Sequence, residues 1–113
     1  MNVPYVPERG DLVWIDFDPQ AGHEQAGKRP AIVLSDSAYN ARIGLCIACP
    51  ITSKRKGYPF EVNIKGKRIS GVILSDQVKS LDWKQRNISF AEKVSRSTLD
   101  TVVENILLLI GSN

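Results

Sequence analysis

The stretch Asp11-Leu-Val-Trp-Ile-Asp-Phe17 sets the fold class of this chain of 113 residues. It is a short apolar segment, rich in β-branched and aromatic residues and bounded by turn residues, which is typical of a β-strand. Six segments of the same kind follow at Ala31–Ser35, Leu45–Ile51, Phe60–Ile64, Gly71–Ser75, Gln77–Leu81 and Ile88–Val94. The first four-fifths of the chain therefore predict a small all-β arrangement.

The end of the chain changes its period. Apolar residues recur at three- and four-residue steps from Leu99 to Ile110, which predicts an amphipathic helix. Ser97 and Asp100 fit a capping box, and Gly111 is placed to end the helix in a left-handed conformation. The sequence therefore predicts a mainly β fold, a small barrel that one carboxy-terminal helix closes.

Two predicted connections are long, polar and glycine-bearing: Asp18–Lys28 and Ser53–Pro59. Loops of that kind often carry function. A third stretch, Asp36–Gly44, is ambiguous and is compatible with a short helical turn. Without repeats or linkers, residues 1–113 are expected to form one domain.

The formal net charge is +3, and the basic residues gather in two short stretches around Lys54–Lys56 and Lys65–Arg68. A polyanionic partner and a merely solvated basic surface both account for this pattern. The longest apolar run, Ile106–Ile110, is far shorter than the roughly 18 residues of a membrane span. Because the amino terminus also lacks a secretory pattern, we expect a cytoplasmic protein.

The two cysteines, Cys46 and Cys49, have the spacing of a redox motif or of half a zinc site. They fall within a predicted strand, where residues three apart point to opposite faces, and no further Cys or His cluster completes a metal site. The favoured interpretation is a pair of reduced structural cysteines, and no metal is expected.

Three segments carry residue types that can act on a phosphodiester. Arg29 lies before Pro30, which favours an extended backbone at the arginine, and its guanidinium can bond two phosphate oxygens. Alternatively, Arg29 only braces the loop by pairing with carboxylates such as Glu24. Thr52 can supply a neutral donor or simply form a turn. In the last segment, Ser75–Trp83, the acidic and amide side chains can read base edges, while the tryptophan can stack on a base or fill the core.

These segments together resemble the MazF/PemK family of toxin endoribonucleases, and the resemblance runs from Tyr5 to Gly111. Its carriers are Gly10-Asp-Leu-Val-Trp-Ile-Asp-Phe-Asp18, Glu24-Gln-Ala-Gly-Lys-Arg-Pro-Ala31, Val33-Leu-Ser35, Cys49-Pro-Ile-Thr52, Gly57-Tyr-Pro-Phe60 and Ser75-Asp-Gln-Val-Lys-Ser80. The resemblance implies a Src-homology-3-like barrel of the CcdB/MazF/PemK type that dimerises to form a groove for single-stranded RNA. It also implies sequence-specific, ribosome-independent cleavage of messenger RNA to a 2′,3′-cyclic phosphate and a 5′-hydroxyl, without metal or cofactor. The expected partner is a MazE-like antitoxin whose acidic or apolar tail occupies the groove.

The resemblance also assigns roles to individual residues. It implies that Arg29 and Thr52 are the catalytic pair, with Glu24 in support. Residues expected to bind RNA are Phe17, His23, Lys54, Lys56, Asp76 and Gln77. Arginine is a very poor general base, because its pKa lies above ~12. The base therefore stays open between Glu24 and His23, the latter standing where close relatives commonly carry serine.

Two other functions fit the same barrel. A gyrase inhibitor resembling CcdB acts through its carboxy-terminal helix and presents a tryptophan near the chain end, whereas here Trp14 and Trp83 lie elsewhere. A non-catalytic RNA-binding barrel would use the same basic loops and leave the bound RNA whole. RNA cleavage in EDTA separates the three hypotheses.

Overall fold

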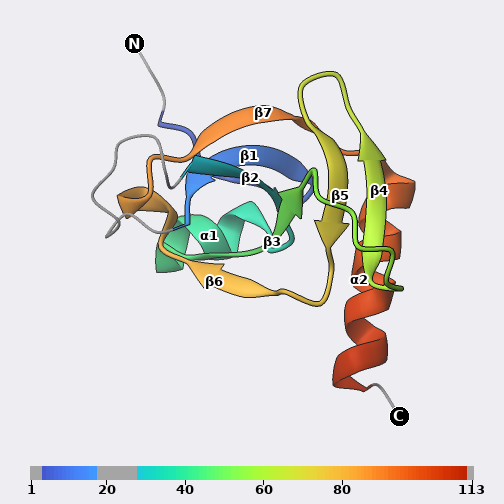
Figure 1. Ribbon diagram of the computed structural model, residues 1–113. Helices are drawn as coiled ribbons and strands as arrows, with labels where there is room; N and C mark the ends of the chain where they lie inside the picture. Colours follow the sequence, from blue (N-terminus) through green and yellow to red (C-terminus); the bar gives the residue numbers. More distant parts are fainter. Residues whose placement is uncertain (1–3, 18–27, 112–113) are drawn as a thin grey trace.

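The computed structural model describes residues 4–17 and 28–111 (Figure 1). Within these ranges the strands are β1 (Asp11–Asp16), β2 (Lys28–Val33), β3 (Cys46–Thr52), β4 (Glu61–Lys65), β5 (Ser70–Leu74), β6 (Lys79–Leu81) and β7 (Ser89–Lys93). The helices are α1 (Ser37–Ile43), the short 3-10 helix η2 (Trp83–Gln85) and α2 (Arg96–Ile110). This is the predicted mainly β fold with a carboxy-terminal helix.

The strands form an antiparallel, strongly curved sheet in the order β4-β5-β3-β2-β1-β7 (Figure 1). β3 lies at the bend, because it changes partner along its length. Its first half pairs with β6, from Cys46 to Ala48, and its end pairs with β5 at Ile51 and Thr52. The end of β3 therefore joins the β4–β5 pair to the rest of the sheet.

Both faces of the sheet are covered, and the side chains alternate between two cores. Along β1, Leu12 belongs to the core beneath α2, whereas Val13 and Ile15 belong to the core on the other face. The two cysteines on β3 also point to opposite faces. Cys49 lies in the core beneath α2, the first core, and Cys46 lies in the core on the other face, the second core. Both are free and buried, which confirms the structural interpretation.

α1 and η2 complete the second core. Asp36 caps α1 by accepting a hydrogen bond from the Tyr39 amide, so the ambiguous stretch does form a short helix. Trp83 is only 6% exposed, and its indole N–H donates to the Asn40 carbonyl oxygen at 3.0 Å. The core interpretation of this tryptophan is confirmed.

Several predicted boundaries are corrected by the structure. β2 begins at Lys28 rather than at residue 31, so Arg29 lies inside the strand and not at its entrance. The strand predicted over Gln77–Leu81 is shorter, because only Lys79, Ser80 and Leu81 pair with β3. The pairing of neighbouring strands decides these limits, and a single segment does not reveal it.

The predicted capping box is also wrong. Ser95 caps α2 by accepting from the Thr98 amide, while Asp100 forms an ion pair with Arg96 at 3.2 Å. Gly111 ends the helix at φ 78° and ψ 144°, a positive φ outside the left-handed helical region. Serines stand at both candidate cap positions, 95 and 97, so local sequence does not decide which one caps the helix.

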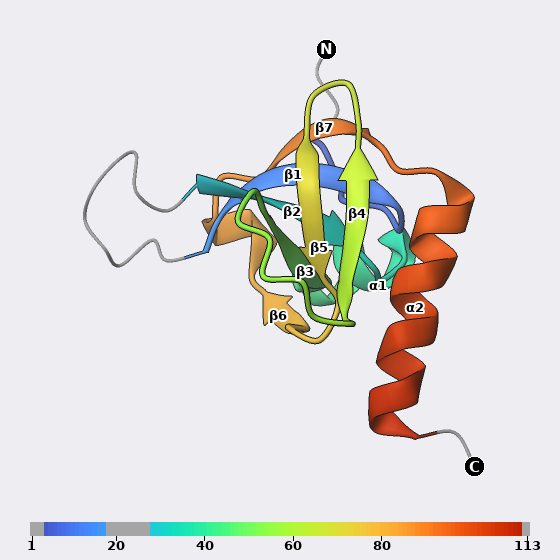
Figure 2. The ribbon, with the colours of Figure 1, turned by 45° about the vertical axis from the view of Figure 1, so that its right-hand side comes forward.

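α2 packs on the first core through Leu99, Val102 and Ile106, and its last turn lies beyond this contact. Val102 is its fully buried residue, whereas the last turn is exposed on every side, with Leu108 at 76% and Ile110 at 72%. In Figure 2 this end of the helix extends away from the strands. Among the described residues, no helix is long and apolar enough to cross a membrane.

Candidate functional site

One row of paired residues crosses the sheet at the end of β3. Arg29 on β2 pairs with Ile15 on β1. On its other side β2 pairs with β3, with Ala31 opposite Pro50. Because the strands are antiparallel, continuing this register by two residues places Arg29 opposite Thr52. Paired residues of neighbouring strands project to the same face of a sheet. Arg29 and Thr52 therefore share a face, although 22 positions separate them in the chain.

These two side chains line a cleft with a volume of about 510 Å³. Six of the predicted site residues line it: Phe17, Arg29, Thr52, Lys54, Lys56 and Gln77. Arg29 is exposed and Thr52 is half-buried. Because the lining also includes Lys79, the cleft is strongly cationic and suits an anionic ligand.

The backbone around Thr52 is held from two sides. Its hydroxyl oxygen accepts a hydrogen bond from the Lys54 amide at 3.1 Å, so the hydroxyl proton is available to a ligand. On the other side Gly71 of β5 approaches so closely that a Cβ there would lie 2.4 Å from the Thr52 carbonyl oxygen. Gly71, with φ +140°, is thus the residue that lets β5 meet the end of β3.

Glu61 holds the conformation of the basic loop, residues 53–60, which follows Thr52. The Glu61 carboxylate accepts hydrogen bonds from the Lys56 and Gly57 amides at 2.8 and 2.9 Å. At the end of this loop the Tyr58 hydroxyl donates to the Asp76 carboxylate at 2.7 Å, and this hydrogen bond raises the pKa of Tyr58. The two carboxylates fix the loop against β4 and against the turn before β6.

The structure thus brings most predicted site residues together. Asp76 is exposed beside the cleft, where it holds Tyr58, so its contact with RNA stays a prediction. Glu24 and His23 lie outside the described residues. Sequence reasoning missed Tyr58, Glu61 and Lys79 as lining residues. Tyr58 and Lys79 lie within conspicuous motifs, yet only the strand pairing shows that these motifs face one cleft.

No group of three or more His, Cys, Asp or Glu side chains gathers as metal ligands would in the described ranges 4–17 and 28–111. The functional groups that gather at the cleft are a guanidinium, ammonium groups, hydroxyls, the Gln77 amide and one carboxylate, Glu61, which binds backbone amides. The cationic groups and hydroxyls bind phosphate oxygens and offset negative charge on them.

A family model described as "PemK-like, MazF-like toxin of type II toxin-antitoxin system" matches residues 8–110. The chain is 49% identical to the endoribonuclease toxin MazF of Escherichia coli K12 over 107 residues, which cover 95% of this chain and 96% of the relative. It is 30% identical to the endoribonuclease PemK of Escherichia coli, over 91% and 81% of the two chains.

Solved structures agree with these matches. The crystal structure of MazF from Deinococcus radiodurans superposes with a TM-score of 0.87 at 48% identity, covering 96% of this chain and all of that one. A MazE–MazF complex from the same organism gives a TM-score of 0.86 at 41% identity, covering 97% and 100%. The likeness therefore extends over the sheet, the cleft and α2 together.

Proposed function

This chain belongs to the PemK-like, MazF-like family of type II toxins, the toxin endoribonucleases of toxin–antitoxin systems, and we propose that it cuts single-stranded RNA at the Arg29–Thr52 cleft without a metal ion. The observation that carries the proposal is the shared sheet face of Arg29 and Thr52, inside a cleft lined by lysines. Cations at this place can offset the charge that a bound metal would otherwise offset.

The reaction follows from the substrate's own 2′-hydroxyl. Its oxygen attacks the adjacent phosphorus while its proton passes to a base, and the bond from phosphorus to the 5′-oxygen breaks as that oxygen takes up a proton. The products are a 2′,3′-cyclic phosphate and a 5′-hydroxyl. Arg29 stabilises the negative charge on the phosphorane oxygens, and the Thr52 hydroxyl donates one further hydrogen bond. The base is assigned to Glu24 or His23.

The proposal is tested by incubating the purified protein with a mixed-sequence RNA in EDTA. Discrete cuts with cyclic-phosphate ends are expected, and Arg29→Ala should lower the cleavage rate by roughly 10²–10³-fold, as the loss of one charge-stabilising donor does. Arg29→Lys should recover only part of the rate, since lysine keeps the charge but not the bidentate geometry. Arg42→Ala, on α1, is the matched control. Cutting only with added magnesium would contradict the proposal, and binding without cuts would favour the non-catalytic barrel.

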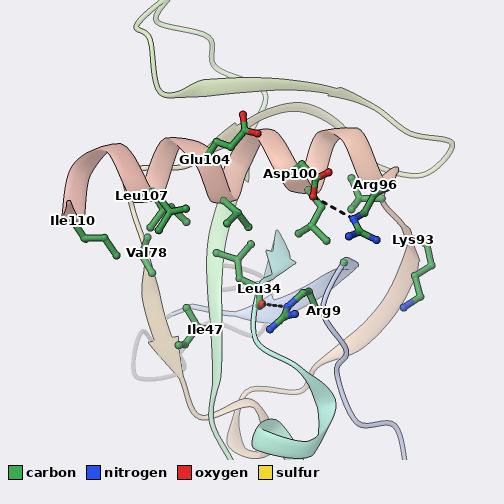
Figure 3. A pocket seen from close by; sticks show the side chains of 15 residues that line it. Arg9, Leu34, Ile47, Val78, Lys93, Arg96, Asp100, Glu104, Leu107 and Ile110 are labelled. Atoms are coloured by element: carbon green, nitrogen blue, oxygen red, sulfur yellow. Dashed lines mark hydrogen bonds and ion pairs between the residues drawn. The ribbon is translucent and has the colours of Figure 1, made fainter. Parts of the chain in front are cut away.

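The chain is further proposed to form a homodimer through a groove beside α2. This groove, of about 920 Å³, has an apolar end at Val78, Leu107 and Ile110 and a charged end at Arg96 and Asp100 (Figure 3). Exposed leucines on a helix end favour burial against another surface. A surface that carries both signs of charge can complement itself about a twofold axis, so a second copy is the occupant that fits.

A MazE-like antitoxin is proposed as the inhibitor. The solved complexes from Deinococcus radiodurans pair MazF with MazE. In this chain the cationic cleft, with Arg29, Lys54 and Lys79, favours an acidic segment of such a partner. Its binding there would block RNA access directly.

A further inference from the structure

We propose that single-stranded RNA continues out of the cleft across the basic loop to the outer face of β4, where Arg55 and Lys65 hold a flanking phosphate. This inference rests on the proposed function, because it extends the same RNA beyond the bond that is cut. Its occupant is the phosphodiester backbone of that RNA rather than a separate ligand.

The cleft and this outer face lie on the same side of the sheet. Thr52 pairs with Val72 on β5, and Val72 pairs in turn with Asn63 on β4. Because paired residues project to the same side of a sheet, Asn63 lies on the face that carries Thr52. Two strand spacings separate them, roughly 10 Å. Val72 between them is only 1% exposed, so a chain bound at Thr52 would pass across the basic loop to reach β4 rather than over β5 itself.

A second hollow lies on this path. It has a volume of about 310 Å³ and is lined by Arg55, Asn63, Ile64, Lys65 and Ser70. Lys65 and Ser70 are cross-strand partners, so an ammonium group and a hydroxyl stand side by side. Lys65 follows Asn63 by two residues on β4, roughly 7 Å along the strand. The hollow thus offers phosphate-binding groups at a second point.

Arg55 is positioned for this role by Asn63. Its guanidinium donates a hydrogen bond to the Asn63 side-chain oxygen, which draws the side chain from the basic loop over β4. A guanidinium has five N–H donors, so others are left for a phosphate. Lys54 and Lys56, the neighbours of Arg55, line the cleft instead. The basic loop therefore supplies cations to both sites.

Among the described residues neither Arg55 nor Lys65 forms an ion pair, and the nearby carboxylates bind backbone amides instead. Glu61 accepts from the Lys56 and Gly57 amides. Glu92 accepts from the amides of three successive residues in the β4–β5 turn, at 2.8–3.0 Å: Lys67, Arg68 and Ile69. This contact also lowers the pKa of Glu92 and anchors the turn that carries two further basic side chains. The outer face therefore stays attractive to a polyanion.

The test measures RNA affinity as a function of salt in the Arg29→Ala background, where binding is separated from cleavage. The probes are a short RNA spanning only the cleaved bond and the same RNA extended by several nucleotides on its 5′ or its 3′ side. Each phosphate contact on single-stranded nucleic acid adds about 0.7 to the slope of log affinity against log salt. One extended RNA should show a slope steeper by about 0.7–1.4 than the short RNA.

The double substitution Arg55→Gln and Lys65→Gln should abolish this added slope, and Lys65→Gln alone should reduce it. Arg42→Gln, which removes the same charge from α1, should keep the whole gain. Thermal unfolding checks that each variant is folded, and the single exposed Lys65 variant decides the question if the double variant does not fold. Extended RNAs that add no slope, or a gain that survives both substitutions, would overturn the inference. Wild-type cleavage, measured in parallel, tests the proposed function separately.

Discussion

Gly71→Ala probes the contact that holds the end of β3, and with it the catalytic geometry proposed for Thr52. The added Cβ would lie 2.4 Å from the Thr52 carbonyl oxygen and 3.0 Å from its carbonyl carbon, whereas ordinary contacts begin at 3.4 Å. Both obstacles are backbone atoms, so neither can rotate away. The end of β3 or β5 must therefore shift by about 1 Å.

Such a shift should affect rate more than folding. Overpacking in a close-packed region costs about 1–3 kcal/mol of unfolding free energy. The φ of +140° adds about 1–3 kcal/mol of strain for an alanine, and a domain of ordinary stability, about 5–15 kcal/mol, tolerates the sum. Misplacing a reacting group by about 1 Å can lower the rate about a hundredfold. We expect Gly71→Ala to stay folded and to cleave RNA about a hundredfold more slowly in single-turnover assays, with the folded fraction measured by thermal unfolding.

Gly44→Ala is the matched control. Gly44 also has a positive φ, +84°, but a Cβ there meets nothing within 4 Å, and the residue ends α1 rather than a cleft strand. Its substitution should cost about 1–2 kcal/mol, the penalty of a left-handed conformation, and leave the cleavage rate unchanged. A folded Gly71→Ala protein with the wild-type rate would refute the argument, as would equal rate losses in both variants.

The remaining predictions concern stability, thiol reactivity and assembly. Glu92→Gln should destabilise the protein by about 1 kcal/mol at pH 7. Because the folded pKa of Glu92 is lowered, the stability that this carboxylate contributes is present above about pH 4.5 and is lost as the pH falls through the folded pKa. Denaturation curves of the two proteins should therefore converge in acid. Burial raises the pKa of Cys46 to about 11 and of Cys49 to about 12, so both thiols should resist a disulfide reagent at pH 8 until denaturant is added, and rapid labelling of the native protein would contradict this. Leu107→Asp should convert the dimer to monomer in sedimentation velocity, whereas Thr101→Asp on the same helix should not; an unchanged dimer would place the interface elsewhere.

The side-chain pattern predicted those features that depend on neighbours along the chain. The short apolar run Asp11–Phe17 predicted a strand, and the structure adds that both of its faces are buried. The spacing of Cys46 and Cys49 placed them on opposite faces, which the two cores confirm. The three- and four-residue period after Leu99 predicted α2, because one helical turn repeats at nearly that interval.

Errors arose where distant residues decide the outcome. β2 starts earlier than predicted because Lys28 and Arg29 pair with β1 at Asp16 and Ile15. The helix cap at Ser95 could not be told from the serine two positions later, since either can accept an amide hydrogen bond.

The sequence by itself determined the strand and helix types and the unpaired cysteines, and through its resemblance to the MazF/PemK family it singled out Arg29 and Thr52 as candidate catalytic residues. Only the tertiary structure decided that these two side chains share a face, and that this face continues to Asn63. The physical reason is that alternation within a strand depends on adjacent peptide units, whereas register between strands depends on backbone hydrogen bonds between segments far apart in the chain.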